Sequence, residues 1–593
     1  MRGLNFQLNP VPVRFRSFRS RVWLVIGLMV LSGFAIAGRA VDLQVLQHET
    51  LANMAQRQSQ RVIKRQGKRG TILDRTGGRL ALSVRAESLY AHPAQVEDPG
   101  EVAIQLAQIL EESRDEIERK LNSDVPFIWL QRKLSPMQAV RVKGLQLKGL
   151  GMTNEYRRVY PSRFLAASLL GFTGVDSQGL EGLEYAYDSY LRGSERLQVL
   201  EQDALGRVFV AGEAASPSAG GNLRTTIHPA VQFIAEQELA QQVKATESKV
   251  GVALVLDSLT GEILALAQAP GFNPNDYQGY DRSTFFNRGI TSGYEPGSTF
   301  KVITAATALE TGVVKPDDVF FCENGKFEHF DSVIHDTSPH GYLVLSRVLA
   351  LSSNICAAKI GLFIPAQNFR AAISRFGFGN KPGLFSTRDG KQLAGEAEGY
   401  VLPVEKWTPV DHAAISFGHG ILVSPLQLVA AVNTIATGGK RMAPLLVTEV
   451  RDAAGKIVIR NRPRSEGRII SEETASLVRD YMVGVVHDKG GTGWRGAVPG
   501  YKVAGKTGTT EKYDIKARGY SKTRLTASFV GFVPAERPKL TILVVIEEPL
   551  QGRSGGLVAA PVFRSIAARA LPLLGIWPNE GVQRKPAPKL VGK

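Results

Sequence analysis

A serine and a lysine stand three residues apart at the start of an apolar, alanine-rich stretch. In YEPGSTFKVITAATALE, residues 294–310, Ser298 follows a Pro-Gly pair and Lys301 opens the apolar run. A helix that begins near Ser298 places both side chains on one face, because residues three apart are neighbours there. Serine becomes a nucleophile when a base takes its proton, and lysine can be that base when desolvation or a second cation lowers its pKa. The spacing therefore indicates a nucleophile with its base, the simpler alternative being a solvated lysine on a helix.

Two more polar motifs follow along the chain. Ser352, Ser353 and Asn354 open a helical run, where Ser and Asn are also common as N-caps. The chain's only Lys-Thr-Gly lies at residues 506–508, after a short apolar segment. Each motif alone is weak evidence. In this order, however, Ser-x-x-Lys, Ser-x-Asn and Lys-Thr-Gly form the signature of penicillin-recognising serine acyltransferases.

The elements that must position these motifs indicate an α+β domain. Residues 250–270 contain two apolar runs around an Asp-Ser-Leu-Thr-Gly turn, which predicts a β-hairpin, and residues 526–549 repeat the pattern around a proline-containing turn. The segments between them are mostly helical, for example residues 425–437. Strands from both ends that enclose a helical middle predict an antiparallel sheet framed by helices.

A different region precedes this domain. Residues 71–73 suggest a short strand, residues 76–78 a turn, and a second strand starts at Arg79. Residues 100–145 show helical periodicity, and the small residues of 211–222 form the best boundary signal. We therefore predict three regions after the first 38 residues: residues 39–215, residues 220–575 with the three motifs, and a basic, proline-rich tail over 576–593.

The N-terminus predicts a membrane anchor. Residues 22–38 carry no charge, and the first 21 residues contain arginines but no acidic residue. A stretch of this length can cross the cytoplasmic membrane once. By the positive-inside rule, residues 1–21 stay in the cytoplasm, and the chain after the anchor lies in the periplasm or extracytoplasmic space. A cleaved signal peptide is the alternative, because residues 35–37 resemble a cleavage site. We favour a single-pass anchor.

Composition narrows the remaining classes. The net charge of +17 is compatible with a nucleic-acid-binding protein. However, the basic residues concentrate near both ends of the chain, and the predicted membrane anchor argues against nucleic-acid binding. The sequence has no His-Glu-x-x-His or Cys-x-x-Cys spacing, so we predict no metal site and no cofactor. Cys322 and Cys356 could form a disulfide, which the sequence leaves open.

The motifs and their surroundings resemble the class B penicillin-binding proteins. Residues 222–570 are similar to the transpeptidase domain of this family through EPGSTFK, LSSN, FGHGILVSPLQLVAAVNTIATGG, GKTGT and ASFVGFVPAERPKL. RGTILDRTGGRLALS and LLGFTGVDSQGLEGLEYAYDSYLRG resemble its pedestal, and the second stretch is most similar to the septal, FtsI-like subtype. The resemblance implies a serine β-lactamase/transpeptidase-like catalytic domain on an elongated mixed pedestal.

The resemblance also implies a mechanism and partners. Ser298 would attack the D-Ala–D-Ala carbonyl of a peptidoglycan stem peptide, and Lys301 would take its proton. The implied roles of the other residues are a proton relay for Ser352, peptide binding for Asn354, carboxylate binding for Lys506, Thr507, Gly508 and Thr509, and an oxyanion hole formed by the N–H groups of Ser298 and Thr509. The implied partners are stem peptides, β-lactams, the membrane, an FtsW-type glycosyltransferase and other division proteins, but no nucleic acid.

Several alternatives share the acylation chemistry. An elongation-type class B enzyme carries the same three motifs. A D,D-carboxypeptidase or β-lactamase would pass the acyl group to water, but no Glu-x-x-Leu-Asn follows the Ser-Ser-Asn motif and the pedestal is long. A penicillin-binding scaffold is less expected because all three motifs are intact. A bifunctional class A enzyme needs a glycosyltransferase domain, for which the region before residue 211 is too short.

Overall fold

The computed structural model describes residues 15–202, 208–210, 217–384, 395–514 and 519–578. Three predicted segments lie wholly or partly outside these residues: most of the cytoplasmic segment, part of the boundary stretch and nearly all of the tail. The chain divides into two compact units. The first unit comprises residues 1–66 and 195–217, and the second comprises residues 67–194 and 218–593.

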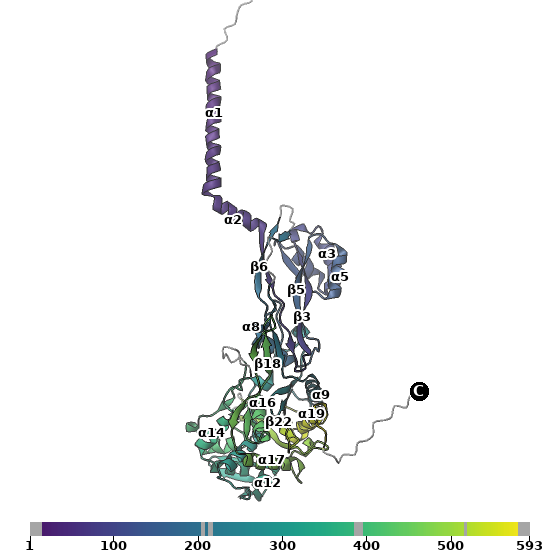
Figure 1. Ribbon diagram of the computed structural model, residues 1–593, viewed down its shortest axis with the longest axis vertical. Coiled ribbons are helices and arrows are strands. Elements are labelled where there is room, and N and C mark those ends of the chain that lie inside the picture. Colours follow the sequence, from purple (N-terminus) through teal and green to yellow (C-terminus); the bar gives the residue numbers. More distant parts are fainter. Residues whose placement is uncertain (1–14, 203–207, 211–216, 385–394, 515–518, 579–593) are drawn as a thin grey trace, which may run out of the picture. The chain divides into compact units, whose positions relative to one another are not determined.

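The first unit contains the N-terminal helix and a small antiparallel sheet of strand order β1-β6-β7. Its helical part, Arg19–Leu46, is apolar, unburied and long enough to cross a membrane, and it includes the predicted anchor at residues 22–38. This helix indicates membrane anchoring. The elements of the unit, visible in Figure 1, are α1 (Phe15–Val41), a π-helical turn (Asp42–Leu46), α2 (His48–Ser59), β1 (Gln60–Gln66), β6 (Glu195–Gln202) and β7 (Val208–Val210).

A five-stranded antiparallel sheet organises the part of the second unit that contains the three motifs. Its strand order is β10-β9-β23-β22-β21, so the two predicted hairpins are confirmed and pair with each other through β9 and β23. The strands are β9 (Val250–Asp257), β10 (Ile263–Ala269), β21 (Ala504–Asp514), β22 (Gly519–Val533) and β23 (Leu540–Glu547). β9 and β23 are buried along almost their whole length, which requires a layer of helices on each face.

Helices cover both faces of this sheet, as predicted. On one face α9 (Pro229–Ala245) packs beside α19 (Ala560–Leu573). Gly555–Leu573, which ends with α19, is also long and apolar enough to cross a membrane, but half of the apolar window is buried in this layer.

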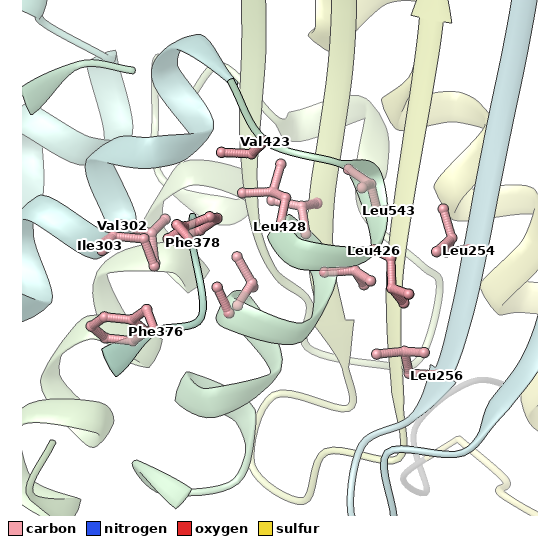
Figure 2. Packing of buried hydrophobic residues seen from close by; sticks show 14 of the residues in the cluster. Leu254, Leu256, Val302, Ile303, Phe376, Phe378, Val423, Leu426, Leu428 and Leu543 are labelled. Atoms are coloured by element: carbon pink, nitrogen blue, oxygen red, sulfur yellow. The ribbon is translucent and has the colours of Figure 1, made fainter. Parts of the chain in front are cut away.

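The other face of the sheet holds α16 (Pro425–Ala436), all of whose residues are buried, as expected for a helix that is apolar all round. Figure 2 shows Leu426 and Leu428 between Leu254 of the sheet and Val302 of α11 (Lys301–Glu310). The helix α16 thus fixes the separation between the sheet and α11.

A second sheet joins strands from before and after the predicted boundary. Its order is β19-β18-β8-β2-β3-β4, with β5 also pairing with β3, and β2 runs parallel to β8. The strands are β2 (Ile72–Leu73), β3 (Arg79–Ala91), β4 (Ile128–Gln131), β5 (Leu150–Val159), β8 (Asn222–Thr225), β18 (Val447–Arg451) and β19 (Ile457–Arg460). The predicted strands at residues 71–73 and from Arg79 are present.

The prediction of continuous helix over residues 100–145 is wrong in its middle. The structure has α3 (Pro99–Leu110), α4 (Arg114–Leu121) and α5 (Pro136–Leu145), with β4 between α4 and α5. Pro126 disfavours helix at the residue before it, and the following Ile-Trp-Leu favours a strand. β4 pairs with β3, so tertiary pairing overrides the helical periodicity here.

Candidate active site

Ser298 lies in a tight turn that leads into α11. The turn Gly297–Phe300 is 3₁₀-helical and the α-helix begins at Lys301, three residues later than the predicted start. Side chains at i and i+3 nearly eclipse in a 3₁₀ turn, so Ser298 and Lys301 still share a side. Gly297 has a φ of +55°, and a Cβ there would lie 2.1 Å from Thr510 Oγ1. The glycine therefore lets β21 approach the turn that carries Ser298.

Lys301 is buried and turned toward the Ser-Ser-Asn motif. The residue is only 1% exposed. Its Nζ donates hydrogen bonds to Ser352 O at 2.6 Å and to Asn354 Oδ1 at 2.7 Å. Ser352 Oγ lies 3.4 Å from the same amine. Within the described ranges the Ser298 hydroxyl has no hydrogen-bond partner, so the proton transfer from Ser298 to Lys301 stays a prediction.

The local backbone explains how Ser352 reaches Lys301. Ser352 ends α12 (Leu345–Leu351) in the left-handed conformation, with φ 63°, and Asn354 begins α13 (Asn354–Phe363). This break between the two helices turns the Ser352 carbonyl toward the lysine while Ser353 caps α13 through Cys356 N. The Ser-x-Asn motif is thus a helix–helix corner as well as an N-cap.

Lys506 approaches Ser352 from the sheet. It lies on β21, is fully buried, and its Nζ donates to Ser352 Oγ at 2.9 Å. Ser352 is therefore contacted by the amines of both Lys301 and Lys506. A Cβ on Gly508 would lie 3.0 Å from Pro296 O, so the same strand also passes close to the Ser298 turn.

The threonines of the third motif differ in exposure. Thr507 is buried, and its hydroxyl lies 2.9 Å from Thr492 Oγ1. Thr509 is exposed on β21, and its Oγ1 accepts a hydrogen bond from Gly555 N at 3.1 Å. The structure thus brings the three sequence motifs together at the sheet edge formed by β21.

Burial controls the protonation of both lysines. Burial lowers the pKa of Lys301 well below its ordinary value, the neighbouring Lys506 lowers this pKa further, and Asp336 opposes the shift. Burial lowers the pKa of Lys506 to about 7. Lys301 is therefore poised to be neutral, as a base must be, at a pH where an exposed lysine is charged.

We expect the Lys506→Gln variant to need a higher pH for acylation by benzylpenicillin. The acidic limb of the rate profile reports protonation of the base, and removing a neighbouring positive charge raises the pKa of Lys301. The limb should consequently move to higher pH. Second-order acylation rates between pH 5 and 9 test this shift, with Lys512→Gln on the same strand as the control. A limb that stays in place or moves to lower pH contradicts the coupling.

Asp336 holds the Ser-x-Asn corner and was not predicted from the sequence. It follows β13 (Ser332–His335), and its carboxylate accepts hydrogen bonds from Ser353 Oγ at 2.6 Å, Asn354 N at 2.5 Å and Ile355 N at 3.0 Å. A carboxylate at a helix N-terminus is favourable both as a cap and toward the helix dipole. The sequence around Asp336 carries no local signal of this contact.

A disulfide joins α13 to a second segment earlier in the chain. Cys322 and Cys356, whose pairing the sequence left open, are bonded, with their Cα atoms 5.1 Å apart. Cys356 lies two residues after Asn354 in α13. The segment before the β12–β13 hairpin (Lys326–His329 and Ser332–His335) is thus attached covalently to α13, and Asp336, directly after the hairpin, is attached to it through its carboxylate.

We expect Asp336→Ala to slow acylation by roughly 10- to 100-fold without removing it. Hydrogen bonds to a charged group contribute about 1.5–3 kcal/mol, and here they fix Asn354 and Ser352 against Lys301. The measurement is the acylation rate constant with a fluorescent penicillin. Asp331→Ala, in the exposed turn between β12 (Lys326–His329) and β13, is the matched control and should behave like the unmodified protein. Equal rates for the two variants would show that the carboxylate does not position the motif.

A glycine-rich loop completes the site on the other side of Ser298. Gly297 N donates to Gly418 O at 3.1 Å, and the His419 ring stacks on Tyr520 with centroids 5.6 Å apart. Burial and then the Lys301 charge lower the pKa of His419 to about 4, which keeps the ring neutral. Tyr520 Oη donates to Glu295 Oε1 at 2.9 Å. The loop is part of FGHGILVSPLQL, but sequence reasoning gave His419 no role.

The described residues contain no group of three or more His, Cys, Asp or Glu side chains that could hold a metal ion. The side chains that the three motifs bring together offer hydroxyl, amine and amide groups. Ser298 in the turn before α11, two buried amines in contact with Ser352, and the Lys-Thr-Gly strand at the sheet edge are typical of the penicillin-recognising serine acyltransferases.

Comparison with known proteins places the chain more narrowly. Residues 251–568 match the penicillin-binding protein transpeptidase domain, and residues 64–225 match the penicillin-binding protein dimerisation domain. The chain is 34% identical to the peptidoglycan D,D-transpeptidase FtsI of Escherichia coli, over 94% of this chain and 92% of the relative. It is 33% identical to stage V sporulation protein D of Bacillus subtilis, over 95% and 87%.

A solved structure of similar fold is penicillin-binding protein 2X from Streptococcus thermophilus, with a TM-score of 0.72 and 24% identity. The match covers 87% of this chain and 81% of that one. The chain belongs to the class B penicillin-binding proteins, and the resemblance seen in the sequence is confirmed.

Proposed function

We propose that this protein is a peptidoglycan D,D-transpeptidase that cross-links stem peptides during septal wall synthesis. The observation that carries the proposal is the contact of both buried amines, Lys301 and Lys506, with Ser352 beside the Ser298 turn. Burial and the neighbouring Lys506 lower the pKa of Lys301, so that its amine can be neutral and act as a base for the Ser298 hydroxyl. It supports acyl transfer rather than a purely structural use of the three motifs.

The proposed first step is acylation of Ser298. Lys301 takes the hydroxyl proton as Ser298 Oγ bonds to the carbonyl carbon of the penultimate D-alanine. The N–H groups of Ser298 and Thr509 stabilise the oxyanion, and each such donor typically contributes about 2.7–4 kcal/mol. The peptide C–N bond then breaks, and Ser352 relays a proton to the departing D-alanine amine.

The proposed second step transfers the acyl group to an amine of a neighbouring strand. That amine attacks the ester carbonyl carbon and gives up a proton to Lys301. The ester C–O bond to Ser298 then breaks, and Ser298 Oγ takes a proton back from Lys301, which readies both residues for another cycle. Asn354 holds the peptide backbone of the donor. The cation of Lys506 and the hydroxyls of Thr507 and Thr509, with Gly508 between them, bind the terminal carboxylate of the donor before it leaves. No cofactor enters this sequence.

A septal role is favoured by the similarity to E. coli FtsI over nearly the whole chain. An elongation-type class B role remains the second candidate, because its catalytic motifs are the same. We further propose that residues 39–215 form the pedestal, that residues 220–575 form the catalytic domain, and that the anchor leaves residues 1–21 in the cytoplasm. An FtsW-type glycosyltransferase and other division proteins are the proposed partners.

The decisive experiment separates transfer from hydrolysis. The full chain in detergent micelles is incubated with a stem pentapeptide donor and an amine acceptor, and products are followed by mass spectrometry. Cross-linked product with released D-alanine supports the transpeptidase, whereas tetrapeptide alone supports a carboxypeptidase. In parallel, intact mass after benzylpenicillin treatment should show an adduct that persists for many minutes. Rapid clearance with accumulating product would instead identify a β-lactamase-like hydrolase, and no adduct at all would favour a scaffold.

A further inference from the structure

A cavity of about 390 Å³ lies away from the three motifs, at the sheet that joins the two family-model matches. We call it the seam cavity. Its size is within the range of small-molecule sites. Its walls come from the β2–β3 turn, β8, the residue before β10, β18, and β19 with the residues after it. The charged residues among them are Arg75, Arg224, Glu262, Glu449, Arg460 and Arg462.

The two acidic side chains in the seam cavity are already paired. Glu262 Oε2 lies 3.4 Å from Arg75 Nη2. Glu449 accepts from Arg451 at 2.9 Å, outside the cavity lining, and from Arg460 at 3.4 Å. The carboxylates thus neutralise only part of the positive charge around the cavity.

The remaining guanidinium groups are short of acceptors. Arg224 Nη2 donates to the Arg75 carbonyl at 3.1 Å. Arg462 is exposed at the cavity wall and has no hydrogen bond or ion pair with any described residue. Each guanidinium carries five N–H donors in a planar fork suited to carboxylate and phosphate oxygens. Like charges that share one cavity repel each other, and an anion placed between them would relieve this repulsion.

The floor of the seam cavity is held rigid by hydroxyl-to-backbone hydrogen bonds. Thr225 Oγ1 donates to Leu73 O at 3.0 Å, and Thr226 Oγ1 lies 2.7 Å from Ile263 O. Thr448 Oγ1 donates to Arg224 O at 3.2 Å. The Thr448 bond links the transpeptidase-domain match to the dimerisation-domain match, and the Thr226 bond joins the segment between the two matches to β10. A site built on rigid strands loses little conformational freedom when a ligand binds.

We propose that the seam cavity is a binding site for an oxyanion, either a carboxylate or a phosphate group, held by Arg224, Arg460 and Arg462. The ligand contacts strands on both sides of the seam and therefore stabilises the junction between the two matched domains. A peptide with free carboxylates and a phosphorylated compound both present this chemistry. The site is separate from the proposed transpeptidase reaction and does not depend on it.

Thermal unfolding of the full chain in detergent micelles tests the site, with glutarate and inorganic phosphate as probes and chloride as the reference at equal ionic strength. A ligand that binds only the folded chain raises the melting temperature in a saturable way. We expect saturable stabilisation by at least one probe. Arg462→Gln, which removes no internal contact, should raise the half-saturating concentration about tenfold, and Arg460→Gln with Arg462→Gln should raise it further.

Arg564→Gln, an exposed arginine of α19, is the matched control and should titrate like the unmodified protein. Preference for glutarate assigns the site to carboxylates, and preference for phosphate assigns it to phosphorylated ligands. Stabilisation no greater than that by chloride, or equal titrations for Arg462→Gln and Arg564→Gln, would overturn the proposal. Acylation by benzylpenicillin should be the same in all these variants, so a failure here is distinguishable from a failure of the proposed transpeptidase.

Discussion

Ser298→Ala is expected to abolish the covalent adduct with benzylpenicillin while leaving the fold intact. The adduct requires an oxygen nucleophile at the head of α11, and the alanine side chain has none. The Ser298 hydroxyl has no hydrogen bond in the described part of the chain, so its removal should cost little stability. Intact mass spectrometry of the full chain, with the melting temperature measured alongside, gives both readouts.

Ser292→Ala, six residues earlier, is the control for Ser298→Ala and should be acylated normally. Peptide mapping of the unmodified protein should locate the penicilloyl group on the peptide that contains Ser298. An adduct of the same mass in Ser298→Ala, mapped to another serine, would assign the nucleophile elsewhere. That result would also remove the basis for the proposed roles of Lys301 and Ser352.

Lys301→Gln is expected to slow acylation by about 10²–10⁴-fold, the usual contribution of a positioned general base. Glutamine can still donate to Ser352 O and Asn354 Oδ1, so it preserves part of the hydrogen bonding while removing the basic nitrogen. The predicted loss therefore reflects proton transfer rather than collapse of the site. Stopped-flow measurement with a chromogenic cephalosporin gives the rate constant.

Lys315→Gln, on the exposed turn after α11, should match the unmodified protein in this assay. The pH profile adds an independent criterion. Because burial lowers the pKa of Lys301, the neutral base is present above that lowered pKa and is lost below it, so the unmodified protein should show an acidic limb. In Lys301→Gln this limb should disappear. Survival of the same limb at a reduced rate would assign it to another group.

The catalytic motifs and the central sheet could be predicted because their signals are local. The β9–β10 and β22–β23 hairpins show apolar runs interrupted by turn residues, and α16 shows a long apolar helical pattern. The three motifs are short and their order is specific. The structure confirms the two hairpins and α16 and starts α11 three residues later than predicted, whereas the roles of the motif residues stay predictions.

The parts that could not be predicted depend on contacts between distant residues. Asp336 is an ordinary aspartate in the sequence and becomes important only where the chain brings it to the start of α13. The strand β4 lies inside a stretch predicted to be helical. It was missed because its stability comes from pairing with β3, a contact between distant residues. The parallel pairing of β2 with β8 is likewise invisible in the sequence, since the paired segments are short and far apart.

The pairing of β9 with β23 constrains the order in which the molecule can be assembled. β9 ends at Asp257 and β23 begins at Leu540, so nearly the whole catalytic region is synthesised between two neighbouring strands. Until β23 emerges, the β9–β10 hairpin keeps an unpaired apolar edge, which is a hazard for wrong pairing and aggregation. Ser298 and Lys301 are made long before β21 delivers Lys506. A growing chain thus carries its proposed nucleophile early but acquires the complete site only when its last strands arrive.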